Sequence, residues 1–171
     1  MKADVFTQGL LRGPSVDAIS AGDDATEFLH LIDDSGAVAL FDYWTHLVRA
    51  HGLAMKRWFD PLEVPHLLPH IYIEEWDVGR QQSRMRLMGE ALRSQWKENV
   101  VGLCTDDHVH GSVNELWKQS DQIVYFDRCT VLLAYNMAYI DRPHCTLIDL
   151  ALPMNDDAGS KFALGYIWPS R

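Results

Sequence analysis

The spacing of the hydrophobic residues changes at a proline-rich segment, and this change limits the fold more than any other feature of the chain. The segment carries Pro61, Pro65 and Pro69, which fix their own backbone and disfavour a helix in the residue before each. Ahead of it, apolar residues recur at the three- and four-residue spacing of an amphipathic helix over 37–50, with Ser35 before it as a candidate cap and Gly52 after it as a stop. Beyond it, apolar and polar residues begin to alternate, as they do in half-buried strands. The sequence therefore predicts a helix, a run of turns and then a sheet.

Five strands are predicted after the prolines, in two groups separated by helices. The strand ranges are 70–76, 82–88, 131–140, 144–153 and 161–168. Between the groups, a short helix is expected over 89–96 and a longer one over 112–128, begun by a capping box of Ser112 and Glu115. This order predicts an α+β fold, with a five-stranded antiparallel sheet that has helices on one face and an N-terminal amphipathic helix before it.

The length of 171 residues is enough for one core of ordinary size and too little for two. Glycine, proline and aspartate clusters interrupt every periodic pattern up to Gly36. We therefore expect residues 1–36 to form a flexible or loosely packed N-terminal arm and residues 37–171 to form a single domain.

Composition and charge exclude several classes of function. The formal net charge is -9 and no basic stripe is present, which argues against nucleic acid as a partner. No apolar run reaches 18 residues and the N-terminus lacks a signal peptide, so neither a membrane span nor export is expected. Three cysteines without a CxxC pair are typical of cytosolic free thiols, which predicts a cytoplasmic protein.

Candidates for metal, haem or catalytic chemistry are weak. His108 and His110 stand near Cys104 and two aspartates, but a zinc site usually needs a third and a fourth protein donor. His108, His110 and His144 are conceivable haem ligands without an attachment motif. The sequence indicates no metal, and it leaves the cofactor unknown, with neither haem nor flavin indicated.

No arrangement of carboxylates or nucleophiles predicts an enzyme. Glu74 and Glu75 are neighbours on a strand, so their side chains are expected to face opposite ways. The pairs Asp33-Asp34 and Asp156-Asp157 stand just ahead of glycines, as turn residues do. No catalytic residue is predicted.

Asp149 is the one charge that looks misplaced, because it lies inside the apolar run from Leu147 to Leu152. Alternation puts Asp149 on the outer face of its strand, with Ile148 and Leu150 pointing inward. Exposure to solvent is the simpler interpretation. The alternative is a carboxylate at the rim of a pocket or at an interface.

Several short stretches resemble a family of short stand-alone bacterial PAS-like proteins. Residues 60–69 read DPLEVPHLLP, close to that family's DP-x-x-[IV]-P-x-L-L-P run into its first strand. Residues 86–89 resemble its R-L-x-G junction, and residues 40–44, 99–102 and 150–154 resemble further segments. Two strands, a helical insert and three antiparallel strands is also the order of a PAS domain. The resemblance covers roughly residues 37–168.

The resemblance implies signal transduction, in one of two forms. The first is a sensor that takes a small apolar or aromatic molecule into a cavity of ~300 Å³ or more and signals through another protein. The residues expected to line that pocket are Met85, Leu87, Leu92, Trp96, Leu116, Ile123, Ile148 and Leu150.

The second form is a docking module with a filled core, which forms a homodimer or binds a signalling protein such as a histidine kinase. The dimer face expected for it is Leu40, Phe41, Trp44, Leu47 and Val48, so that Trp44→Glu would split the dimer.

Overall fold

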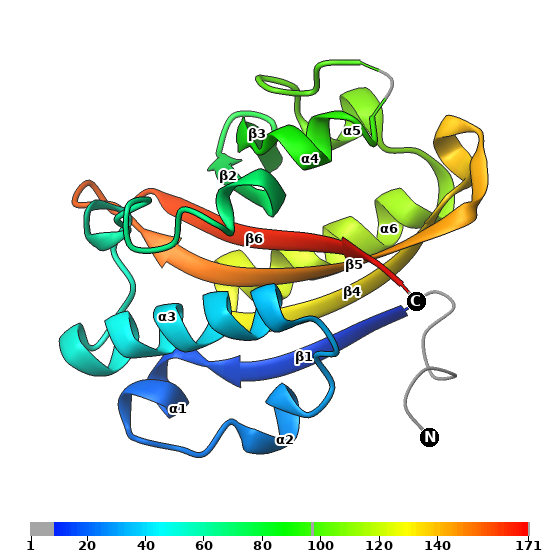
Figure 1. The fold of residues 1–171 in the computed structure, drawn as a ribbon. Helices are drawn as coiled ribbons and strands as arrows, with labels where there is room; N and C mark the ends of the chain where they lie inside the picture. The colour runs from blue at the N-terminus through cyan, green and yellow to red at the C-terminus, as the bar shows by residue number, and fades with distance from the viewer. Residues whose placement is uncertain (1–8, 97, 171) are drawn as a thin grey trace.

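One antiparallel sheet of six strands organises the molecule (Figure 1). The computed structural model describes residues 9–96 and 98–170. In space the strands run β1-β4-β5-β6-β2-β3. Their bounds are β1 Gly9–Ser15, β2 Ile71–Asp77, β3 Gln82–Met88, β4 Cys129–Met137, β5 Arg142–Asn155 and β6 Lys161–Pro169.

Helices fill the connections between the strands. The α-helices are α1 Val16–Ser20, α2 Thr26–Leu29, α3 Ser35–His51, α4 Glu90–Arg93, α5 Thr105–His108 and α6 Gly111–Asp121. Three short 3-10 turns are η1 Lys56–Trp58, η2 Leu68–His70 and η4 Ala138–Ile140, and η3 Gln122–Phe126 is a π-helical turn. The α+β class and the antiparallel sheet are therefore confirmed.

The sixth strand, β1, is the element that the sequence did not predict. It pairs with β4 at one edge of the sheet. Gly13 and Pro14 interrupt the periodic pattern of the sequence here, and the pairing register shifts between Arg12 and Ser15. An edge strand tolerates such residues because its outer side carries no ladder bonds, which is why the pattern was misleading.

Residues 9–36 pack into the domain, so the prediction of a loose arm is wrong for this range. Val16 and Ile19 of α1 are 2% and 0% exposed, and Phe28 of α2 contacts Phe41 at 5.5 Å between ring centroids. Glycine and aspartate clusters divide the apolar residues of this range into short groups, so no long periodic pattern indicated that they pack. Residues 1–8 of the predicted arm lie outside the described residues.

Helices cover both faces of the sheet, so the prediction of helices on one face is wrong. The α3 face carries α1, α2 and α3, and the α6 face carries α4, α5 and α6 (Figure 1). Strands β4 and β6 are buried along almost their whole length on both sides, and β5 is buried in its second half, from Leu147 to Met154. Their apolar runs therefore mark a central layer and not a sheet with one wet face.

Helix α3 is held in place by its caps and by its apolar stripe. Asp34 accepts hydrogen bonds from the N–H groups of Gly36 and Ala37, so the cap is Asp34 and not Ser35 as expected. The helix ends at Gly52, whose φ of 78° is the left-handed conformation predicted for this stop.

The residues predicted as a dimer face are core residues of the same chain. Trp44 is 0% exposed, and its indole N–H donates to Pro153 O at 2.9 Å. All five side chains are between 0% and 6% exposed: Leu40, Phe41, Trp44, Leu47 and Val48. The stripe faces the chain's own sheet, where it packs against apolar residues of the strands. This dimer-face prediction is wrong.

The predicted helix over 112–128 exists, but it changes form near its end. It begins at Gly111, after an N-cap at His110 without a side-chain cap bond. After Asp121 it continues as the π-helical turn η3, which ends at Phe126. π-helical turns are rare in proteins, and those that occur are often found at functional sites. The residues around η3 are therefore candidates for a functional site.

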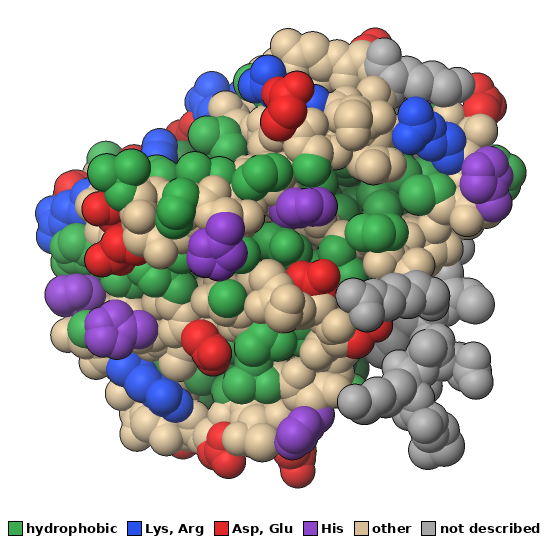
Figure 2. Space-filling model, viewed as in Figure 1, with side chains coloured by type: hydrophobic (Ala, Val, Ile, Leu, Met, Phe, Trp, Pro, Cys, Tyr) green, Lys and Arg blue, Asp and Glu red, His purple; other side chains and the backbone are tan. Residues whose placement is uncertain are grey.

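The outer surface shows no preference for one sign of charge on the face seen in Figure 2. There, Lys and Arg side chains lie scattered among Asp and Glu. Within the described residues, no helix combines the length and the apolar composition that crossing a bilayer requires.

Candidate functional site

Three carboxylic side chains line one cavity in the interior between the sheet and α6, and we call them the acid cluster. Glu74 comes from β2, Asp121 from the end of α6 and Asp149 from the middle of β5. They are 6%, 8% and 4% exposed and line one cavity of about 20 Å³. A cavity of that size admits about one water molecule and no organic ligand.

Asp149 is held by a tyrosine that reaches across a strand. The hydroxyl of Tyr72 on β2 donates to Asp149 Oδ1 on β5 at 2.8 Å. Gly165 of β6 lies between them, and a Cβ at that position would be 1.9 Å from the Tyr72 ring. The glycine therefore leaves the room that the ring needs to cross β6.

Asp121 and Tyr125 bring the π-helical turn into the same site. Hydrogen bonds from Ser83 reach Asp121, and Ser83 also bonds Thr105 Oγ1 at 2.7 Å. Asp121 Oδ2 and the Tyr125 hydroxyl have no hydrogen-bond partner among the described residues. Buried polar atoms are seldom left unpaired, so these two atoms give the cavity polar groups that a water molecule or a proton could satisfy.

Burial shifts the acid cluster towards its protonated form. Desolvation raises the pKa of Asp121 and that of Asp149 from 3.8 to about 7. It also raises the pKa of Glu74 well above 4.5, and the negative charges of Asp121 and Asp149 raise it further. None of the described residues that line the cavity is Lys, Arg or His. The cluster therefore retains protons at pH values where exposed carboxyls are ionised.

The residues predicted to line a pocket are not brought together. Met85, Leu92 and Trp96 are buried on the α6 face, where Leu116 and Ile123 are partly buried. Ile148 and Leu150 pack on the α3 face, and Leu87 is 45% exposed. None of the eight lines the acid-cluster cavity. The prediction assumed that alternate residues of a strand face solvent, whereas these strands are buried on both faces.

Sequence reasoning found part of the acid cluster. The prediction that Glu74 and Glu75 face opposite ways is confirmed, since Glu74 is buried while Glu75 pairs with Arg86. Asp149 does share a face with Leu147 and Ala151, but α6 covers that face, so the expected exposure is wrong. Asp121 carried no sequence signal, because a polar residue within the predicted helix over 112–128 is ordinary.

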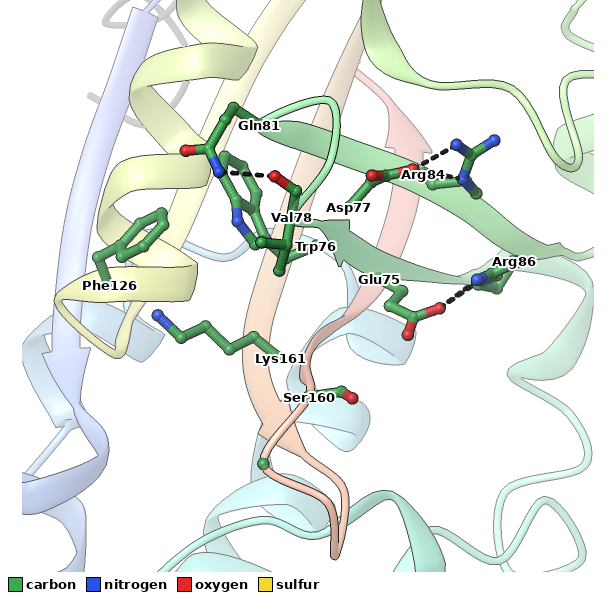
Figure 3. A pocket seen from close by; sticks show the side chains of 11 residues that line it. Glu75, Trp76, Asp77, Val78, Gln81, Arg84, Arg86, Phe126, Ser160 and Lys161 are labelled. Carbon is green, nitrogen blue, oxygen red and sulfur yellow. Dashed lines mark hydrogen bonds and ion pairs between the residues drawn. The ribbon is translucent and has the colours of Figure 1, made fainter.

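A second feature is an open groove of about 560 Å³ beside the β2–β3 turn, which we call the hairpin groove (Figure 3). Its walls come from residues 75–78, from Arg84 and Arg86 of β3, from Phe126 and from residues 159–161. Figure 3 shows Lys161 pointing towards Phe126, while the Asp77–Arg84 and Glu75–Arg86 pairs lie on the other side.

The π-helical turn contributes to both features. Tyr125 faces the acid cluster, and the next residue, Phe126, lines the hairpin groove. Trp76 contacts both rings, with centroid distances of 5.3 Å to Tyr125 and 5.1 Å to Phe126. The interior cluster and the surface groove are thus separated by one layer of aromatic side chains.

The histidines and cysteines considered as ligands do not form a centre in the described part of the chain. His108 is buried, and its Nδ1 lies 3.0 Å from Cys104 O, whereas His110 is exposed. No group of three His, Cys, Asp or Glu side chains among the described residues is arranged to hold a metal ion. The three cysteines are free thiols.

Comparison with known proteins gives no further guide. No family model matches the chain, and neither the curated proteins nor the solved structures include a match.

Proposed function

We propose that this protein is a PAS-like signalling domain that acts by binding another protein and that encloses no organic ligand. Without β1, the chain runs through two strands, a helical insert and three antiparallel strands, which is the PAS order. The resemblance of residues 60–69 to the proline-spaced run of stand-alone PAS-like proteins supports the same proposal.

The observation that favours a protein-docking domain over a small-molecule sensor is the small size of the cavity between the sheet and α6. A sensor for an apolar or aromatic molecule would need ~300 Å³ there. The cavity has about 20 Å³, and its lining is acidic. Haem and flavin are larger still and do not fit this cavity.

The test is native mass spectrometry with an absorption spectrum on freshly purified protein, followed by chemical cross-linking in cells. We expect the bare mass of the chain or of its oligomer, no visible band, and a discrete cross-linked complex with another protein. A stoichiometric organic adduct would contradict the filled interior. The absence of any complex would contradict the docking function.

The acid cluster favours a second, more specific form of this function, in which the domain responds to protons. Glu74 and Tyr72 from β2, Asp149 from β5, Asp121 from α6 and Tyr125 from η3 face one cavity without a cation. Loss of a proton would leave a buried charge beside the π-helical turn, which also supplies Phe126 to the surface. The test is whether partner binding changes between pH 5 and pH 8 in the wild type but not in Asp121→Asn.

A further inference from the structure

The hairpin groove is built on a rigid frame, which is the first requirement of a docking site. Its β2–β3 turn is tied by Asp77, which accepts from Arg80 N–H at 2.9 Å, and by the Gln81 amide, which donates to Val78 O at 2.7 Å. The β5–β6 turn is tied by Asp156, which accepts from Ser160 N–H at 2.8 Å. A preformed surface loses little entropy on binding.

The groove presents apolar surface to solvent. Val78 is 73% exposed and Phe126 is 43% exposed, and both are among the large hydrophobic residues that the structure leaves at the surface. Trp76 lies half-buried between them and is packed edge-on against Phe126. Exposed aromatic surface in a concave place is characteristic of binding sites.

The charge of the groove is opposite to that of the chain. Arg84 and Arg86 are matched by Asp77 and Glu75, which leaves the ammonium group of Lys161 in excess. That group lies 3.8 Å above the Phe126 ring and has no carboxylate partner among the described residues. A groove with one excess cation stands out on a chain of net charge -9.

We propose that the hairpin groove binds an acidic segment of the partner protein, with an aromatic or apolar side chain of that segment on Trp76 and Phe126 and a carboxylate at Lys161. This proposal rests on the proposed function and names the chemistry of the partner. An aromatic ring gains contact area on the exposed rings. A carboxylate replaces water at an ammonium group that already lies against an aromatic face.

The probe is the peptide acetyl-Glu-Glu-Phe-Glu-Glu-amide, titrated into the full chain. Binding is followed by the indole N–H resonance of Trp76, which is assigned by its loss in Trp76→Phe. We expect a saturable shift, with weaker binding when alanine replaces the peptide's phenylalanine. The peptide with lysines in place of glutamates should not bind.

Charge reversal provides the decisive variant. In Lys161→Glu we expect affinity for the acidic peptide to fall by about tenfold or more, and the lysine peptide to gain binding. Lys118→Glu on α6 makes the same change in net charge outside the groove and should leave both affinities unchanged. If Lys161→Glu does not fold, Lys161→Gln removes the charge alone and should still weaken binding several-fold.

Three results of the peptide titration would overturn the proposal: no saturable shift, equal affinity in wild type and Lys161→Glu, or binding of free phenylacetate without binding of the peptide. The last result would make the groove a site for a small aromatic acid. A cross-linked cellular complex that persists in Lys161→Glu would place docking elsewhere and leave the proposed function intact.

Discussion

The two faces of the sheet are both buried, but they are filled with different chemistry. The α3 face is a dry apolar core around Trp44 and Phe41, in which aromatic rings contact each other directly. The α6 face holds Glu74, Asp121 and Asp149 among its apolar residues. An apolar core stabilises at every pH, whereas buried carboxyls tie stability to protonation. The comparison predicts that the stability contributed by the α3 face is independent of pH and that the stability contributed by the α6 face depends on pH.

The largest effect is expected on the α3 face. Trp44→Glu replaces a fully buried indole with a charge and removes the hydrogen bond to Pro153. Loss of the side chain alone costs about 3–5 kcal/mol, and burial of an unpaired carboxylate adds to that cost. Thermal unfolding by circular dichroism should show no cooperative transition. Leu62→Glu, at a site 84% exposed, is the control and should unfold like the wild type. A folded Trp44→Glu protein of halved mass would restore the dimer-face interpretation.

The second largest effect is the pH dependence of the unfolding free energy, which we expect from the α6 face and not from the α3 face. The raised pKa values mean that the folded state binds more protons than the unfolded chain between about pH 4 and pH 7. Stability from the acid cluster is therefore fully present below pH 4 and is lost as the pH rises to 7. For Asp149, a shift from 3.8 to about 7 corresponds to roughly 4 kcal/mol.

Asp149→Asn removes that dependence, so it should gain stability relative to the wild type at pH 8 and show a shallower slope between pH 5 and pH 8. Urea unfolding at several pH values measures both. Asp157→Asn, in the exposed β5–β6 turn, is the matched control. Surface carboxyls have the opposite effect on stability. The hydrogen bonds from Arg84 and Arg80 lower the pKa values of Asp77 and Asp107, so these two carboxyls favour folding at higher pH. A wild-type slope that Asp149→Asn leaves unchanged would contradict the role of the cluster.

A smaller effect tests how Tyr72 reaches Asp149. Gly165→Ala places a Cβ against the Tyr72 ring, and the ring must move away from its carboxylate. Overpacking of this kind costs about 1–3 kcal/mol. In the background Tyr72→Ala the same change should cost little, and the difference appears in a double-mutant cycle of unfolding free energies. Equal costs in both backgrounds would show that the ring does not occupy this path.

The smallest effect is expected at the surface. Arg86→Ala breaks the pair with Glu75, in which the arginine side chain is 50% exposed. Exposed pairs contribute about 0–1 kcal/mol, so urea unfolding should barely change. A loss above about 2 kcal/mol would mean that the groove wall supports the fold and not only the surface.

Most helices and strands could be predicted from the sequence, but the face of the sheet on which each residue lies could not. The range 82–88 and the stop at Gly52 were predicted as they occur, because alternation and a left-handed glycine are local signals. The predicted pocket combined residues from two faces of the sheet, such as Met85 and Ile148. A strand buried on both sides lacks the alternating polar residues that would show which side chains share a face.

The acid cluster was visible only in part for a related reason. Asp149 stood out inside an apolar run, but its partner Tyr72 lies 77 residues away and the glycine between them belongs to a third strand. Such contacts depend on the order of strands in space. No local pattern in the chain records that order.

The raised pKa values of the acid cluster are tested most directly by a carboxyl ¹³C NMR titration of the folded protein. The aspartate signals are assigned with the variants Asp121→Asn and Asp149→Asn. The account predicts that both side chains titrate with apparent midpoints near pH 7, coupled to each other through Glu74. Midpoints near 4 for both would show that the carboxyls are ionised and solvated in the native state, and would contradict the distinction between the two faces.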